Sequence, residues 1–156
     1  MRRDNNIVEL LNDVLTSELT SVNQYFVDSK MLANWGYERL AEKFRNESIS
    51  EMKDADELIG RILFLEGVPN LQRLGTLQVG EDVAEKLQAA LALEYTSIQR
   101  LNDGIAACVA AGDNGTRELL DDILDGEEEF ADWIETQQEL IRQVGEAHYL
   151  AQNIRD

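Results

Sequence analysis

Apolar residues recur at intervals of three and four along four long stretches of the chain, as in helices that bury one face. Glycines and short polar turns separate most of these stretches, as expected where a helix ends. Each long helix would measure roughly 40–45 Å at about 1.5 Å per residue. The pattern predicts four long helices and a short fifth, which span about residues 5–34, 37–66, 81–111, 116–144 and 146–153.

The connection between the second and third predicted helices is much longer than the others. It covers residues 67–80 and holds three glycines and Pro69, the only proline of the chain. Two helical hairpins joined by one long crossover form a four-helix bundle, so the predicted fold class is all-α. We also expect the crossover to pack against the bundle through its apolar side chains, Leu71, Leu74, Leu77 and Val79.

Length and composition agree with one helical domain that spans residues 1–156. The chain has 156 residues, of which 44% are hydrophobic, enough for a sizeable core. Its 14 basic and 31 acidic side chains give a net charge of −17, which argues against nucleic acid as a partner. An acidic surface is compatible with attracting cations, although it serves solubility in most proteins.

The cysteine count and the apolar runs predict where the protein works. Cys108 is the only cysteine, so no disulfide can form within the chain, and this favours a reducing cytoplasm. The longest apolar run, Ile105–Ala111, is far too short to cross a bilayer. We therefore expect a cytoplasmic protein with no membrane partner.

Each long predicted helix carries one glutamate inside its apolar stripe. The spacing repeats, because 33 residues separate the two glutamates of the first hairpin and 33 separate those of the second. A carboxylate in a core is costly unless it is paired or holds a metal. Edge placement, where the charge is solvated, is the alternative reading. The four residues are Glu18, Glu51, Glu94 and Glu127.

These glutamates match part of a known metal-binding pattern. Di-iron carboxylate bundles use a Glu from each of two helices and a Glu-x-x-His motif from each of the other two. Here Glu18 and Glu94 would be the lone glutamates. The two motif positions read Glu51-Met-Lys-Asp54 and Glu127-Glu-Glu-Phe130, so both histidines are missing. Asp54 can supply an oxygen, whereas Phe130 has no lone pair to donate.

At this point the chain resembles the bacterioferritin family over essentially its whole length. The segments that carry the resemblance are NQYF (23–26), NWG (34–36), ESISEMKDAD (47–56), RILFLEGVPNLQ (61–72), GEDV (80–83), LALE (91–94), DWIE (132–135) and YLAQ (149–152). The resemblance implies a ferritin-like four-helix bundle with a short fifth C-terminal helix. It also implies a subunit of a twenty-four-subunit cage that stores ferric mineral.

In that family the four stripe glutamates bind the ferroxidase iron pair, and histidines occupy positions 54 and 130. Because both are replaced here, we expect ferroxidase activity to be absent or strongly reduced. Asp54 is retained as a candidate metal ligand, and Tyr25 is expected near the site. So many carboxylates cannot all stay ionised in a dry core, so a cation binds there, water fills the site, or some carboxyls are protonated. Of these three outcomes we favour a wet or weakly metallated site. An active ferroxidase homopolymer, in which Asp54 and water replace the histidines, is the alternative, so whether the chain is an enzyme stays open.

Met52 is turned about 100° from Glu51 around a helix. Methionine commonly fills gaps in cores and interfaces, but a thioether can also ligate haem iron. The resemblance implies that Met52 and its mate from a neighbouring subunit bind one haem b across a two-fold axis. Candidate wall and propionate-contacting residues of this cofactor site are Leu19, Asn23, Phe26, Arg45 and Ile49.

The resemblance also implies partners. The segment Val68–Glu81 is a candidate docking surface for an electron donor such as a small ferredoxin. The impaired centre leads us to expect a mixed cage with a second, ferroxidase-competent subunit type. A scaffold that binds neither metal nor haem is a third possibility.

Overall fold

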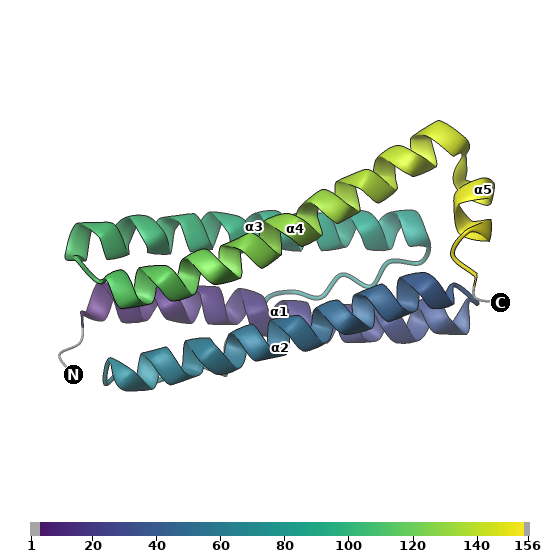
Figure 1. Ribbon diagram of the computed structural model, residues 1–156. Helices are drawn as coiled ribbons and strands as arrows, with labels where there is room; N and C mark the ends of the chain where they lie inside the picture. Colours follow the sequence, from purple (N-terminus) through teal and green to yellow (C-terminus); the bar gives the residue numbers. More distant parts are fainter. Residues whose placement is uncertain (1–3, 155–156) are drawn as a thin grey trace.

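The computed structural model describes residues 4–154, and all regular secondary structure in that range is helical (Figure 1). α1 pairs closely with α2 and α3 with α4, while α1 and α3 join the two hairpins and α2 and α4 touch least. No helix in this range combines the length and hydrophobicity needed to cross a bilayer. The predicted all-α bundle with one long crossover is confirmed, with helices α1 Asn5–Asn34, α2 Glu38–Phe64, α3 Val83–Ala111, α4 Asn114–Val144 and α5 Glu146–Ala151.

Short polar residues fix where the helices begin. The carboxylate of Asp82 accepts a hydrogen bond from the amide of Glu85 at the start of α3. Asp113 caps α4 in the same way, by accepting from the amide of Thr116. This cap explains why α4 begins at Asn114, slightly before the predicted start. Gly112, with φ of 70°, ends α3 in a left-handed conformation that suits glycine.

Two hydrophobic clusters fill the bundle, one at each end. The cluster near α5 includes Leu32, Phe44, Leu87, Phe130 and Tyr149. The cluster near the N-terminus includes Ile7, Leu15, Leu58, Leu101 and Leu120. Along every long helix the stripe glutamate lies between residues of one cluster and residues of the other. The apolar core is therefore interrupted at mid-height by a layer of carboxyl groups.

The crossover runs beside α1 (Figure 1), but not in the way its apolar residues predicted. The expectation that its leucines pack it down is wrong, because Leu71, Leu74, Leu77 and Val79 are all exposed in the subunit. Polar side chains of α1 hold its backbone instead. Asn12 Oδ1 accepts a hydrogen bond from the amide of Asn70 at 2.8 Å, and Thr20 Oγ1 accepts one from the amide of Gly75 at 2.8 Å. Gln24 Oε1 accepts one from the amide of Gln78 at 2.7 Å.

A second polar group is buried where the crossover meets α3. Lys86 of α3 and Asp28 of α1 are both fully buried, and Lys86 Nζ lies 2.9 Å from Asp28 Oδ1. The amide group of Gln24 donates to Asp28 and also to the carbonyl of Gln78. Lys86 Nζ lies 5.3 Å from the ring centroid of Trp35. This network ties α1, α3 and the end of the crossover together.

Candidate metal centre and methionine groove

The four stripe glutamates are all buried. Glu18, Glu51 and Glu94 are 0% exposed and Glu127 is 1% exposed. Among residues 4–154, no hydrogen-bond donor from outside the carboxyl cluster reaches Glu18 or Glu51, which meet only each other and Glu127. Buried polar atoms in native proteins almost always have a partner. Carboxyl oxygens at this depth that meet only other carboxyls indicate a place for a ligand that brings positive charge.

Four carboxylates converge on one point. One oxygen each from Glu18, Glu51, Asp54 and Glu127 lies within 4.8 Å of the others. Asp54 is half-buried, so the group opens toward solvent on its side. The predicted Asp54 is thus brought together with three of the four predicted glutamates. Glu94 lies outside this group of four.

Glu94 is engaged by other partners. The hydroxyl of Tyr25 donates to Glu94 Oε1 at 2.5 Å, and the carboxyls of Glu94 and Glu127 interact directly. Tyr25 itself is fully buried. Tyr25 was expected near the site, and it contacts one of the predicted ligands directly. This contact occupies one of the two oxygens of Glu94.

Burial and mutual repulsion keep protons on this cluster. Burial, followed by the charge of Glu127, raises the pKa of Glu18 well above its usual range. Burial, followed by the charge of Glu18, does the same for the pKa of Glu51. Burial, with the charges of Glu57 and Glu94 adding to it, raises the pKa of Asp54 to about 7. Without a bound cation, the centre therefore holds protons at neutral pH.

Phe130 occupies the position where the family pattern places its second histidine. Its ring is buried, stacks on Trp133 with centroids 5.6 Å apart, and meets the ring of Tyr25 edge-on at 5.3 Å. Phe44 closes the group at 5.8 Å from Phe130. These four rings fill the end of the centre next to Glu94 with carbon.

Glu47 is a further carboxyl near the centre that the sequence analysis did not single out. Burial, followed by the charge of Glu94, raises its pKa to about 7, and it also interacts with Glu51. Lys43, one turn earlier on α2, lies over the rings of Phe130 and Trp133. Glu47 precedes Glu51 by four residues, which places the two side chains on the same face of a helix, and this spacing could have identified it from the sequence.

The donor set of the centre consists of oxygen atoms. His148 is the only histidine of the chain, and it lies on α5, exposed and far along the sequence from the stripe glutamates. The residues present do not fit an iron pair held in the family pattern, because one position offers carbon and the other a short carboxylate. The centre can bind a cation that accepts carboxylates alone.

Met52 lies on the outer face of α2, with 52% of its surface exposed. Its side chain borders a shallow groove whose lining is mainly apolar, formed by Leu19, Lys53, Ala55, Asp56, Ile59 and Leu71. Of these, Leu19 was predicted. Leu71 was missed as a groove residue because it comes from the crossover, whose path has no periodicity. An apolar groove beside a solvent-accessible thioether is chemically compatible with ligation of a haem iron.

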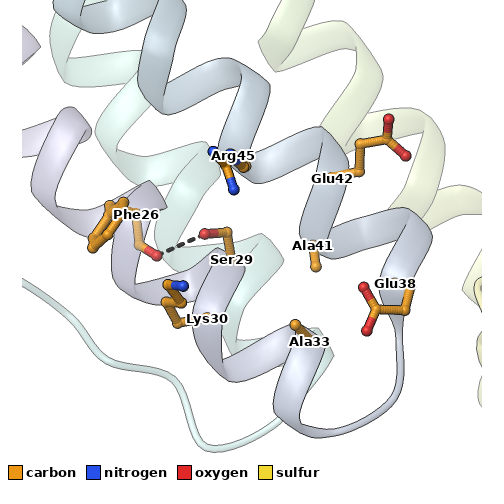
Figure 2. Close-up of a pocket in the computed structure, with 8 residues that line it drawn as sticks. All are labelled: Phe26, Ser29, Lys30, Ala33, Glu38, Ala41, Glu42 and Arg45. Carbon is orange, nitrogen blue, oxygen red and sulfur yellow. Dashed lines mark hydrogen bonds between the residues drawn. The ribbon is translucent and has the colours of Figure 1, made fainter.

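The other predicted cofactor residues lie along the same α1–α2 face but not all in that groove. Phe26 and Arg45 border a separate hollow, together with Lys30 and Glu38 (Figure 2). Lys30 Nζ lies 6.0 Å from the ring centroid of Phe26. Asn23 and Ile49 are exposed on the same two helices. Of the six predicted residues, Leu19 and Met52 thus border one hollow of α1 and α2, Phe26 and Arg45 border the other, and Asn23 and Ile49 line neither of the two.

Comparison with known proteins places this bundle in a class. Residues 8–144 match the family model described as a ferritin-like domain. The chain is 47% identical over 152 residues to the bacterioferritin of Mycobacterium leprae, with 97% of this chain and 96% of that protein covered. It is equally similar to bacterioferritin BfrA of Mycobacterium tuberculosis, at 47% over the same shares. The bacterioferritin of Streptomyces coelicolor is 42% identical over 97% of this chain and 90% of its own length.

The molecule is therefore a ferritin-like protein. Within that class, the chain belongs to the bacterioferritin family.

Proposed function

We propose that this chain is a haem-binding subunit of a bacterioferritin-type iron-storage cage, with weak or absent ferroxidase activity of its own. The 156 residues would form one ferritin-like domain that works in the cytoplasm, as the single cysteine suggests. Iron would be cargo of the cage. The chain would contribute to storage and release of the ferric mineral rather than to its rapid formation.

One observation carries the loss of activity: Phe130 closes one half of the centre with a buried aromatic ring. Rapid oxidation of ferrous ions in pairs needs two adjacent metal positions with donors that suit iron. The other half retains Glu18, Glu51 and Asp54, which supply oxygen alone. The chain would then hold a cation in that half but not pass two electrons from a metal pair.

The cofactor part of the proposal rests on Met52. A half-exposed thioether in an apolar groove is available to a second copy of the chain, so two Met52 side chains could hold one haem b. Bound haem supplies one-electron chemistry at this face. Leu19, Ile49 and Phe26 would shield the macrocycle, and Asn23 would lie at its edge. The basic Arg45 would pair with propionate groups.

The proposed partners follow from the same surfaces. The crossover exposes Val68 at 77% together with four other apolar side chains, which makes it a suitable docking face for a small ferredoxin-type electron donor. A subunit with a poor centre would gain from mixing with a second, ferroxidase-competent subunit type. The assembly would then be a heteropolymeric cage, for which the family resemblance implies twenty-four positions.

Stopped-flow oxidation of ferrous iron by the purified homopolymer tests the proposal. We expect slow oxidation without a fast phase, and a reduced haem absorption band in the same preparation. A fast phase that consumes two ferrous ions per subunit would contradict the loss of activity. A colourless cage after reconstitution with haem would contradict the cofactor assignment.

The active homopolymer is the second candidate, and Asp54 favours it. Its carboxylate lies in the same convergent group as Glu18 and Glu127, so it is placed to act as a ligand. In that case Asp54→Ala would abolish a fast ferrous oxidation phase that the parent protein possesses. In the leading proposal, the parent protein has no such phase.

A further inference from the structure

We propose that the centre is a single-ion site for one hard divalent cation of the Mn²⁺ or Ca²⁺ type, and not a two-metal site. The inference deepens the proposed function and rests on it, because it concerns the same carboxylates. It assigns the number of ions and their chemical class. The four ligands are Glu18, Glu51, Asp54 and Glu127.

The spacing of the oxygens supports a single ion. The four converging oxygens, one from each side chain, lie within 4.8 Å of one another. Oxygens on opposite sides of a cation bound at about 2.4 Å are about 4.8 Å apart, so all four can reach one ion in a single coordination sphere.

The state of the ligands supports a bound ion rather than an accidental acidic patch. Glu18 and Glu51 are completely buried, and no donor from outside the carboxyl cluster reaches either oxygen of each group among residues 4–154. The two residues come from different helices of one hairpin, and Glu127 reaches the same point from the other hairpin. A cation at this point would satisfy all of them at once.

Two contacts disfavour a second position. The hydroxyl of Tyr25 donates to Oε1 of Glu94, so one of the two oxygens that a second ion could use is taken. The ring of Phe130 packs against Tyr25 and Trp133 on that side and puts carbon where the family pattern has a nitrogen donor. Glu94 itself lies outside the convergent group.

The donor type selects the class of ion. Carboxylate oxygen suits hard cations such as Ca²⁺ and Mn²⁺, while imidazole suits iron and zinc. The four ligands carry only oxygen, and Asp54 leaves one side half-open for solvent ligands. The site would hold the cation as a structural element and so stabilise the carboxyl layer between the two hydrophobic clusters.

Binding of Mn²⁺ to the assembled protein, stripped of metal by a chelator, tests this. Free Mn²⁺ is measured by electron paramagnetic resonance during titration. We expect one ion per subunit, bound with a dissociation constant of about 10 µM or tighter, and displacement by excess Ca²⁺. Two equivalent ions per subunit, no binding in this range, or no displacement by Ca²⁺ would overturn the inference.

Two matched pairs of variants locate the ion. Glu127→Gln should lose the tight ion, while Glu128→Gln, which changes the exposed neighbouring carboxylate on α4, should keep it. Phe130→His should add a second ion, while Val109→His, at a position 63% exposed on α3, should not. Equal loss in both glutamine variants would mean adventitious surface binding and would refute the site. A stoichiometry of one in Phe130→His would refute the role given to Phe130.

Failure here is distinguishable from failure of the proposed function. A cage that binds one Mn²⁺ per subunit but takes up no haem would contradict only the cofactor assignment. A cage that binds haem and oxidises iron slowly, yet binds two Mn²⁺ ions or none, would contradict only the single-ion site.

Discussion

Two buried polar clusters lie inside this bundle, and they differ in how their charges are matched. Around Asp28, the carboxylate meets Lys86 at 2.9 Å and an amide donor from Gln24. Around Glu18, four carboxyl groups face one another, and in the described residues no donor from outside the cluster reaches Glu18 or Glu51. The first cluster is complete within the chain. The second is complete only with something added.

This difference distinguishes a buried charge that stabilises the fold from buried carboxyls that are placed to bind a ligand. A buried charge with a good partner holds elements together, as Asp28 does for α1, α3 and the crossover. A buried carboxyl group without a counter-charge lowers the stability of the fold, and a bound cation would remove that cost. The comparison can be tested by disturbing each cluster in turn, and it predicts effects of different kind and size.

The largest effect on stability is expected at the matched cluster. Lys86→Met leaves Asp28 buried without its counter-charge and should lower the free energy of unfolding by about 3–5 kcal/mol. Chemical denaturation followed by circular dichroism measures this. The double variant Asp28→Asn/Lys86→Met should recover part of the loss, and the exposed Lys30→Met should change stability by less than about 0.5 kcal/mol. Equal losses in the single and double variants would show that the charge pair is not the cause.

At the unmatched cluster, the largest effect concerns chemistry. The double variant Asp54→His/Phe130→His restores nitrogen donors at both positions and should speed ferrous oxidation by about 100-fold or more, about 2.7 kcal/mol of barrier. Stopped-flow absorbance on the variant and the parent homopolymer measures the ratio. The double variant Asp132→His/Val109→His, at two exposed positions, is the control. A ratio near one would mean that the missing histidines do not limit the reaction.

The pH dependence of stability should also distinguish the clusters. The pKa values of Asp54 and Glu47, both raised to about 7, exceed the value near 4 expected in the unfolded chain. The folded state therefore holds protons that the unfolded state has released, and the stability they confer is present at low pH and lost as pH rises through about 7. The Tm of the metal-free protein should fall between pH 5 and pH 8, and saturating Mn²⁺ should reduce the fall. A Tm that rises across this range without metal would contradict the assignment.

The smallest effect on stability is expected on the outer face of the bundle, at Met52. Met52→Leu replaces an exposed side chain with one of similar size and should change the free energy of unfolding by less than about 0.5 kcal/mol. The reduced haem absorption band should nevertheless disappear, because leucine has no lone pair for iron. The exposed Leu140→Met on α4 is a control that should leave haem content unchanged. Retention of haem by Met52→Leu would contradict the assignment of the Met52 thioether as a haem ligand.

Spacing alone predicted much of the fold. The intervals of three and four placed the helices with ends that fall within about two residues of those observed. The same intervals placed Glu18 and Glu51 in their stripes, and the structure buries both. A helix is formed by contacts between residues close in sequence, so its periodicity can be recognised from the sequence alone.

The rest depended on contacts between distant segments. The pair of Lys86 and Asp28 went unnoticed, although Lys86 stands in the stripe of α3, three residues after Val83. Which acid would meet that lysine depends on how α1 lies against α3, and no local pattern encodes this. The predicted packing of the crossover was wrong for the same reason. Leu71 and Leu74 are apolar and were expected to be buried, but the path of the crossover leaves both exposed.

The attachment of the crossover has a consequence for how such subunits diversify. Asn12, Thr20 and Gln24 hold main-chain atoms of the crossover, so its attachment does not depend on the exposed side chains of Leu71 and Leu74. Gly75 is an exception, because a Cβ there would lie 3.1 Å from the hydroxyl of Thr20. Substitutions at the exposed leucines should therefore alter the outer surface of the subunit while the three polar anchors and the interior remain constant.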